Sequence, residues 1–285
     1  MSSVLEETKF LMKKYNISAN KSLGQNFLID DEIVEGIVTK ANITKNDLII
    51  EIGPGLGTLT SKMLECAGKV IAIELDDRMI KILNDRFYLY NNFKLIHQDV
   101  LKVDLQELIK ENTNNEITQV KRVANLPYYI TTPIIMKLLE DKLPVESITV
   151  MVQKEVADRL TARPGEKLTG AITYCVSYYS EAEEIMNVPN SSFIPAPEVN
   201  SAVIQLKIRN NPPVEIENEE QFFKIIKASF MQRRKTLLNG LTNANIASKD
   251  TIKQVLVELD LPENIRGENL NLQQFAQLSN KLFTK

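Results

Sequence analysis

LIIEIGPGLGTLT (residues 48–60) is the stretch of the sequence that decides the fold. Its first five residues, LIIEI, are almost entirely apolar and β-branched, so they predict a buried strand. The glycines Gly53, Gly55 and Gly57 follow directly, and a helix is predicted from about 58 to 67. A buried strand that passes through a glycine turn into a helix is typical of a parallel α/β sheet with a ligand at the turn.

Strand-like and helix-like segments alternate on both sides of this stretch. Such alternation is typical of βαβ units and of a mostly parallel sheet with helices on its faces. The apolar run 200–208 comes late and predicts an antiparallel strand at the edge of the sheet. We therefore predict an α/β, Rossmann-like fold. Its other strands are predicted over 69–76, 93–100, 120–126 and 146–153, and its other helices over 78–87 and 132–141.

The end of the sequence has a different character. A linker rich in proline and charge, RNNPPVEIENEE, spans 209–220 and shows no apolar period. Beyond the linker no strand pattern is found, and helical spacing recurs over 219–239, 248–260 and 271–283. We therefore predict two domains, a sheet domain over 1–208 and a small helical domain over 209–285.

The composition limits the possible classes of function. Of the 285 residues 44% are hydrophobic, which suits a large and a small domain with filled cores. Cys66 and Cys175 lie far apart without metal-ligand spacing, so we expect no disulfide, no metal and a reducing cytoplasmic location. The sequence shows neither a signal peptide nor an apolar run of the roughly 20 residues that span a membrane. Because the net charge is −3, any nucleic-acid site must be a local basic patch.

The glycine turn and a later acidic residue together predict a nucleoside-containing ligand. Glu74 ends the second strand, 21 residues after Gly53, where a carboxylate can accept hydrogen bonds from both ribose hydroxyls. The glycine spacing is G-x-G-x-G, so the third glycine comes one residue earlier than in dinucleotide sites. A cofactor without phosphate is therefore favoured, and S-adenosylmethionine is the obvious one. A tight turn without a ligand, and for Glu74 a solvated strand end, are the alternatives.

Two further strand ends carry polar side chains. Asp99, at the end of the third strand, can accept from the adenine amino group of the cofactor or can cap a helix. The stretch NLPY ends the fourth strand, where the Asn125 side-chain oxygen and the Leu126 carbonyl can converge on one exocyclic amine. Pro127 fixes the local chain, and Tyr128 can stack on the base that carries the amine. A turn with buried tyrosines is the alternative.

Together these motifs resemble the ribosomal RNA adenine N6-dimethyltransferases, and most closely their bacterial small-subunit members. The resemblance runs from about Lys21 to Lys235 and carries the family's motifs in order: KSLGQNFLID, EIGPGLGTLT, IELD, QDVL, NLPYYITTPI, MVQKEVADRL, FIPAPEVNSAVI and FMQRRKTLLN. It implies transfer of two methyl groups to each of two adjacent adenines in a hairpin loop near the 3′ end of 16S rRNA. The partner would be 16S rRNA within the pre-30S particle, with no membrane involved, and we expect a monomer.

The resemblance also implies a class I S-adenosylmethionine-dependent methyltransferase sheet. The segment 1–47 would then be a helical lid over the cofactor in a catalytic domain, and 209–285 would recognise RNA. Residues of the GQNFL, IELD and QDVL motifs would surround the cofactor, beside the glycines and acids already named. These are Gln25, Asn26, Leu28, Leu75 and Val100, and the cofactor site would also include Asn125.

Two further roles rest on the resemblance. Phe193, in SSFIPAPEV, would flank the target adenine opposite Tyr128, and a hydrophobic anchor for a proline-rich loop is its alternative. Arg233, Arg234 and Lys235 resemble an RNA-contacting cluster, for which a charged helix face is the ordinary alternative.

Three other functions stay open at this point. A large-subunit rRNA adenine methylase of the macrolide-resistance type has the same layout, although its glycine turn and Asn-Pro motif usually differ from GPGLG and NLPYYITTP. An oxidoreductase that binds a nucleotide cofactor would use a similar sheet, but the early third glycine argues against it. The helical end of the chain also suits a ribosome assembly factor with secondary catalysis.

Overall fold

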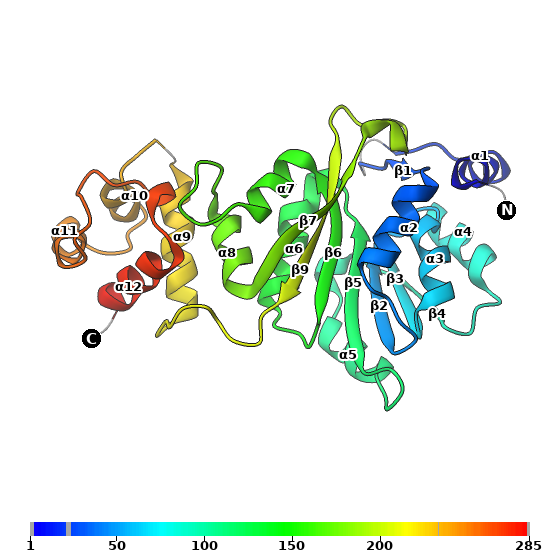
Figure 1. The fold of residues 1–285 in the computed structure, drawn as a ribbon, viewed down its shortest axis with the longest axis horizontal. Helices are drawn as coiled ribbons and strands as arrows, with labels where there is room; N and C mark the ends of the chain where they lie inside the picture. Colours follow the sequence, from blue (N-terminus) through cyan, green and yellow to red (C-terminus); the bar gives the residue numbers. More distant parts are fainter. Residues whose placement is uncertain (1–2, 21–23, 233, 284–285) are drawn as a thin grey trace. The chain divides into compact units, whose positions relative to one another are not determined.

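The strand that leads into the glycine turn, β2 (Asp47–Ile52), lies inside a sheet in the computed structural model, which describes residues 3–20, 24–232 and 234–283 (Figure 1). Within these residues the sheet has seven strands in the order β4-β3-β2-β5-β6-β9-β7. β2 pairs in parallel with β3 and β5, and parallel pairing continues outward to β4 and β6. The remaining strands of this sheet are β3 (Lys69–Glu74), β4 (Phe93–His97), β5 (Gln119–Asn125), β6 (Ser147–Gln153), β7 (Ser180–Val188) and β9 (Ser201–Ile208).

The predicted α/β class is confirmed, but the predicted edge strand lies one position inside the edge. β9 is antiparallel to β6, as expected, and β7 is its outer neighbour. The sequence of β7, SEAEEIMNV, is rich in glutamate and alternates between partial burial and exposure. Glutamate is depleted in strands and the segment has no continuous apolar run, so its sequence gave no strand signal.

Helices cover both faces of the sheet. On one face α2, α3 and α4 pack into a buried cluster that includes Ile49 of β2 and Val123 of β5. The next residue back in β5, Arg122, points to the opposite face, where its guanidinium donates to the Leu138 carbonyl of α6 at 2.8 Å. The helices of this region are α2 (Asp31–Lys40), α3 (Thr58–Cys66), α4 (Asp77–Phe87), α5 (Leu105–Asn112), α6 (Thr131–Glu140) and α7 (Lys154–Thr161).

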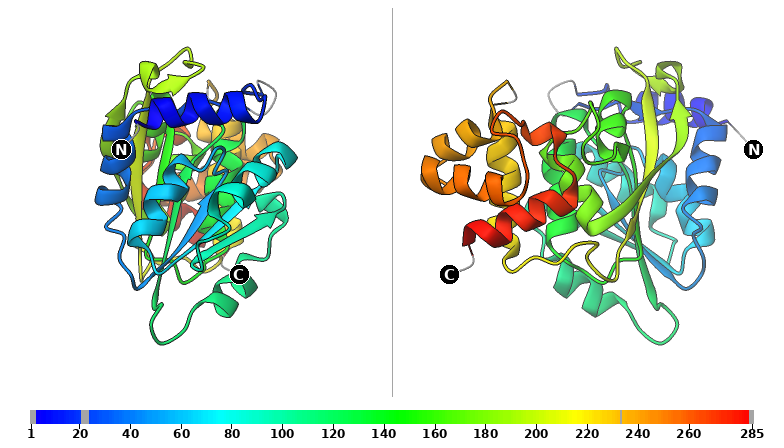
Figure 2. Two further views of the ribbon diagram at one scale, coloured as in Figure 1. Left: turned by 90° about the vertical axis from the view of Figure 1, so that its right-hand side faces the viewer. Right: turned by 60° about the vertical axis from the view of Figure 1, so that its left-hand side comes forward.

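A short two-stranded sheet and the first helix lie at one end of the large sheet. β1 (Phe27–Leu28) pairs antiparallel with β8 (Phe193–Ile194). α1 (Val4–Lys14) begins at a capping box between Ser3 and Glu6 and lies across the same end (Figure 2). Segments far apart in sequence therefore meet beside the strand ends.

The chain divides into two compact units, of which the second is helical. One unit comprises Met1–Ala157 with Glu183–Ile208, and the other Asp158–Ala182 with Arg209–Lys285. The boundary expected at 208 coincides with one of these divisions, but 158–182, predicted in the sheet domain, belongs to the helical unit. The reason is α8 (Ala171–Tyr179), whose tyrosines pack into the aromatic core of that unit.

The helical unit is built around buried aromatic rings. Tyr174 lies 4.9 Å from Phe275 between ring centroids, and Tyr178 lies 5.5 Å from Phe222. The single helix predicted over 219–239 is interrupted at 231 and resumes at 237. The unit's other helices are α9 (Glu219–Met231), α10 (Leu237–Asn243), α11 (Lys249–Glu258) and α12 (Leu272–Phe283). Across the described residues, no helix is long and apolar enough to span a membrane.

Candidate active site

A pocket lies at the carboxyl ends of β4, β3, β2 and β5. These strands are parallel neighbours, so the residues that follow them meet at one edge of the sheet. The pocket is walled by the segment leading into β1, by the glycine turn with the end of β3, and by the NLPY turn with the start of α6. Its lining residues are 24–28, 51–56, 58, 59, 73–75, 98–100, 125–130 and 134.

The three glycines of the turn differ in what they contact. Gly53, Gly55 and Gly57 all have left-handed backbones, with φ of 65°, 57° and 82°. Gly53 and Gly55 line the pocket, and a Cβ on Gly53 would meet no described atom within 4 Å, so backbone conformation selects glycine there. Gly57 is not among the lining residues. A Cβ at Gly57 would lie 2.6 Å from the ring of Phe87, so this glycine lets α3 approach α4.

Glu74 joins the glycine turn to the end of β3. Its carboxylate accepts backbone N–H groups from Gly55 at 3.2 Å, Leu75 at 2.7 Å and Asp76 at 2.9 Å. The residue is 7% exposed, and burial raises the pKa of its carboxyl above the usual value although these hydrogen bonds oppose the shift. Carboxylate oxygens have lone pairs beyond those used here, so Glu74 can also accept from ribose hydroxyls. The adjacent Leu75 also lines the pocket.

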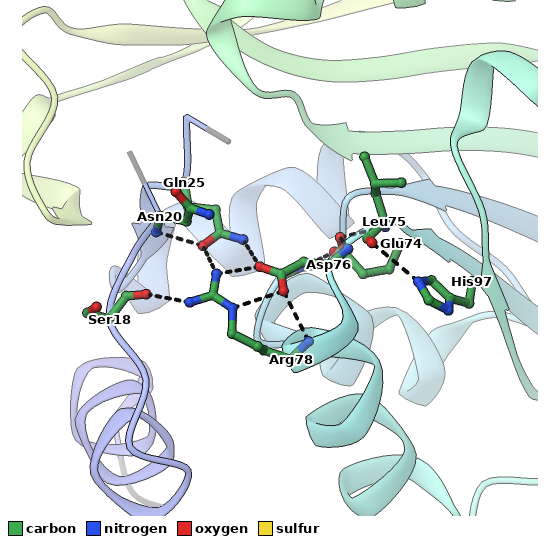
Figure 3. Close-up of polar contacts among 9 residues, drawn as sticks. Ser18, Asn20, Gln25, Glu74, Leu75, Asp76, Arg78 and His97 are labelled. Atoms are coloured by element: carbon green, nitrogen blue, oxygen red, sulfur yellow. Dashed lines mark hydrogen bonds and ion pairs between the residues drawn. The ribbon is translucent and has the colours of Figure 1, made fainter. Parts of the chain in front are cut away.

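Gln25 lines the pocket, but its side-chain amide belongs to a polar network beside it (Figure 3). Its Oε1 accepts from the Asn20 N–H and its Nε2 donates to Asp76, each at 2.9 Å. Arg78 donates to the same Asp76 carboxylate at 3.0 Å and to the Ser18 carbonyl at 3.4 Å. Burial alone would raise the pKa of Asp76, but the bonds from Arg78 and Gln25 outweigh it and lower that pKa. The network holds the segment before β1 against the start of α4.

Asp99 follows β4 and serves as a cap while lining the pocket. Its Oδ1 accepts the Leu101 N–H at 3.0 Å and caps the short 3-10 helix η2 (Val100–Lys102). Asp99 and Val100 are both in the pocket wall. The two alternatives drawn from the sequence are compatible, because the cap uses one of the two carboxylate oxygens.

The orientation of the Asn125 amide is fixed by the segment on the other side of the pocket. Its Nδ2 donates to the Asn26 carbonyl at 3.4 Å. Asn26 in turn donates through its own Nδ2 to the Gly24 carbonyl at 3.3 Å. Because a carbonyl can only accept, the amide nitrogen of Asn125 must face Asn26. The oxygen of Asn125 is therefore the atom that can accept from a ligand.

The rest of the NLPY turn is held by its backbone and by the Thr131 hydroxyl, which donates to the Pro127 carbonyl at 3.1 Å. Leu126 N–H donates to the Met151 carbonyl of β6 at 3.2 Å, and the Pro127 carbonyl accepts from Ile130 N–H at 3.2 Å. The Leu126 carbonyl is the second acceptor that the sequence predicted, and the residue lies in the pocket wall. Tyr128 begins the 3-10 helix η3 (Tyr128–Ile130) and also lines the pocket.

Phe193 is brought next to the pocket wall but not into it. It pairs with Leu28 in the β1–β8 sheet, and Leu28 lines the pocket. Phe193 itself is 3% exposed and packs in the hydrophobic cluster with Phe27 and Leu28. Phe193 therefore lies one strand away from the pocket wall, and its role beside the target adenine stays a prediction.

Sequence reasoning missed Glu51, the acid within LIIEI. It is 1% exposed, lines the pocket and accepts from the Thr60 hydroxyl at 2.5 Å. Burial raises the pKa of its carboxyl to about 8, and the nearby Glu74 adds to this rise while the Thr60 hydrogen bond opposes it. A single acid inside an otherwise apolar strand beside a glycine turn was the signal that could have identified it.

Comparison with known proteins decides the family. Residues 16–284 match the sequence profile of the family described as Ribosomal RNA adenine dimethylase. The chain belongs to this family. A relative from Clostridioides difficile (strain 630), named Ribosomal RNA small subunit methyltransferase A, is 51% identical over 98% of this chain and 96% of its own length. A relative of the same name from Geobacillus sp. (strain WCH70) is 50% identical over 96% of this chain and 95% of its own.

Two solved structures have a similar fold. A dimethyladenosine transferase from Plasmodium falciparum matches with a TM-score of 0.70 and 28% identity, covering 88% of this chain and 95% of that one. The 23S rRNA methyltransferase ErmE matches with a TM-score of 0.66 and 23% identity over 90% of this chain and 99% of that one, which is a likeness of fold alone. The chain is thus an S-adenosylmethionine-dependent methyltransferase, as its motifs predicted.

The pocket residues of this dimethylase fit that cofactor. A Cβ on Gly53 would stand in open space, so a ligand can approach the bare backbone there. Glu74 offers a carboxylate that can accept from hydroxyl groups, and the buried Glu51 favours a positively charged neighbour. Apolar side chains of Leu56, Ile73 and Val100 complete the wall and suit an adenine ring.

The predicted RNA-binding cluster of this dimethylase lies in the helical unit. Arg233 is outside the described residues. Arg234 and Lys235 are exposed in the turn between α9 and α10, so they are not part of a charged helix face.

Proposed function

We propose that this dimethylase transfers methyl groups to N6 of two adjacent adenines in the 3′-terminal hairpin loop of 16S rRNA, placing two on each. The observation that carries the proposal is the Asn125 amide, whose nitrogen is turned toward Asn26 so that its oxygen can accept from an adenine amino group. The choice of the small subunit is supported by the Clostridioides difficile relative, whose name specifies it.

The chemistry follows from the weakness of the nucleophile. The N6 lone pair of adenine is delocalised into the ring, so N6 gains nucleophilicity when its two hydrogens are accepted and the nitrogen becomes pyramidal. Asn125 Oδ1 and the Leu126 carbonyl would accept these hydrogens, and the Tyr128 ring would stack on the base. Bound S-adenosylmethionine supplies a methyl carbon on a positively charged sulfur. N6 would form a bond to that carbon while the C–S bond breaks, so that S-adenosylhomocysteine leaves with the electron pair on sulfur, and one N6 proton would then be lost to water.

Positioning supplies much of the acceleration in such a reaction. Holding the attacking atom near the methyl group in line with the breaking bond converts a bimolecular encounter into a unimolecular step. For the second transfer N6 retains one N–H, so one of the two acceptor positions must then admit the first methyl group. The same residues therefore serve both rounds.

We further propose that the substrate is the pre-30S particle, that the enzyme acts as a monomer, and that it acts in the cytoplasm. The net charge of −3 supports recognition of a folded ribonucleoprotein through a few local contacts rather than by long-range attraction. Arg234 and Lys235 are exposed and would contribute such contacts.

The direct test is to incubate the protein with labelled S-adenosylmethionine and 30S particles that lack the modification. We expect N6,N6-dimethyladenosine at two neighbouring positions of 16S rRNA after digestion and mass spectrometry. A folded Asn125→Ala variant should bind the cofactor but transfer little or no label. Label in 23S rRNA would instead favour the macrolide-resistance type, and assembly fully supported by the inactive variant would favour an assembly factor.

A further inference from the structure

One side-chain contact fixes the far end of the Tyr128 ring. The Tyr128 hydroxyl lies 2.6 Å from the hydroxyl of Ser201, and either atom can be the donor. Ser201 is 0% exposed and is the first residue of β9. The bond therefore ties a ring in the pocket wall to a buried strand more than 70 residues away in sequence.

Ser201 is rigidly placed. Its backbone is in register with Gln153 at the end of β6, and the residues that follow it in β9, 202–206, are buried. The preceding residue, Asn200, accepts the Lys154 N–H through its carbonyl at 3.0 Å. Tyr128, by contrast, belongs to a 3-10 turn outside the large sheet. A hydrogen bond between the two thus transmits the fixed position of the sheet to the turn.

We propose that Ser201 is a positioning residue for methyl transfer, because it sets the plane of the Tyr128 ring against which the target adenine stacks. This inference rests on the proposed function, in which Tyr128 faces that base. A tyrosine ring has two rotatable side-chain bonds, and the backbone fixes only its Cβ end. A bond at the hydroxyl, the opposite end, restrains both rotations.

The plane of the ring matters because it sets the direction of attack. An adenine stacked on a tilted ring would present N6 off the line of the C–S bond, and small misplacements lower the rate of a positioned reaction strongly. The contact is also partly sealed from water, because Ser201 is 0% exposed, and burial raises the pKa of the Tyr128 hydroxyl against the opposing effect of the Ser201 bond. Water therefore has little access to the Ser201 hydroxyl.

The test is a double-mutant cycle on rRNA methylation with Tyr128→Phe and Ser201→Ala. Tyr128→Phe keeps the stacking ring and removes its anchor, and Ser201→Ala removes the partner. We expect each variant to lower kcat by about fivefold, the effect of one hydrogen bond, with KM for S-adenosylmethionine unchanged. The double variant should be no slower than the singles, because both remove the same interaction.

A matched control separates positioning from stability. Ser180 is likewise a serine at the start of a strand, 1% exposed, with its hydroxyl donating to the Val176 carbonyl at 2.9 Å. Ser180→Ala should lower the melting temperature without changing kcat. If Ser201→Ala behaves in the same way, or if the Tyr128 and Ser201 effects multiply, the positioning role is overturned. Should wild-type protein leave adenine N6 of 30S particles unlabelled, the proposed function itself fails.

Discussion

The strand β2 carries a buried acid near each of its ends, and the two acids are held in opposite ways. Asp47 is 0% exposed and pairs with the buried ammonium of Lys121 at 3.0 Å. The same ammonium donates to the Asn42 carbonyl at 2.6 Å and lies 3.6 Å from Glu146. Glu51 is 1% exposed and accepts from the neutral Thr60 hydroxyl, and the nearby Arg86 lowers its pKa less than burial raises it.

This difference between the two acids indicates which end of the sheet binds a ligand. A buried charge is costly unless a partner compensates it. At the amino end the chain supplies that partner itself, so the charges serve stability. At the carboxyl end burial raises the pKa values of Glu51 and Glu74, and a positively charged cofactor would supply the missing compensation. Substitutions at the two ends should therefore affect different measurable quantities.

The largest effect on stability is expected at the amino end. Lys121→Met leaves Asp47 buried without its cation, which should lower the free energy of unfolding by about 3–5 kcal/mol. Urea denaturation measures this loss, and kcat of the remaining folded protein should not change. The control is Lys94→Met, which removes a partly exposed lysine 4.0 Å from Glu111 and should cost about 0–1 kcal/mol. Equal losses in the two variants would contradict the claim that the buried Asp47–Lys121 pair contributes more to stability than an exposed pair.

Glu51→Gln should raise the free energy of unfolding at neutral and alkaline pH, whereas Lys121→Met lowers it. The carboxyl of Glu51 has a pKa of about 8 in the folded protein and 4.5 as its ordinary value. Between these values the unfolded chain loses the proton that the folded chain keeps, so wild-type stability falls as pH rises. The variant lacks this dependence and should be more stable than wild type at pH 8, by on the order of a few kcal/mol, but not at pH 4.5.

The comparison for Glu51 is made by urea denaturation of the cofactor-free protein at both pH values. The same substitution should weaken S-adenosylmethionine binding, because the neutral amide cannot compensate a positive charge. Parallel stability curves for wild type and Glu51→Gln across this pH range would show that the carboxylate is not penalised by burial.

Glu74→Gln should alter ligand affinity. The carboxylate is predicted to accept from the cofactor ribose, and hydrogen bonds to charged groups contribute about 1.5–3 kcal/mol. We expect the Kd for S-adenosylmethionine to rise about 10- to 100-fold by calorimetry, with kcat at saturating cofactor largely retained. An unchanged Kd would remove Glu74 from the cofactor site.

The smallest effect on stability is expected for a partly exposed ion pair at the carboxyl end of the sheet. Arg78 and Asp76 form an ion pair at the carboxyl end, but the Arg78 side chain is 40% exposed. Arg78→Met should therefore cost only about 0–1 kcal/mol of stability, and the cost should shrink in high salt. Denaturation at two salt concentrations measures it. A stability loss as large as that of Lys121→Met, and unaffected by salt, would contradict the claim that solvent exposure weakens this ion pair.

The sequence predicted those features that depend on local pattern. Apolar runs and the glycine turn predicted β2 through β6, and the rule that parallel strand ends meet placed Glu74, Asp99 and Asn125 in one pocket. β7 was not predicted because its sequence is rich in glutamate and has no continuous apolar run. The strand is formed by its pairing with β9. The segment 158–182 was misplaced because its tyrosines pack against helices distant in sequence.

The remaining site features depend on contacts that no local pattern reveals. The burial of Phe193 follows from its pairing with Leu28, which is 165 residues away in the chain. Gly57 belongs to the same glycine motif as Gly53 and Gly55. The Phe87 ring, however, leaves no room for a Cβ at this position. The Ser201 anchor of Tyr128 is likewise a product of tertiary packing.

The most direct test of the account is a crystal structure with S-adenosylmethionine bound. It should show the ribose hydroxyls within hydrogen-bond distance of the Glu74 carboxylate and the methyl group directed toward the Asn125 oxygen. A cofactor bound elsewhere, or an Asn125 amide that turns its nitrogen toward the methyl group, would contradict the claim that the carboxyl end of this sheet brings the cofactor and the adenine together.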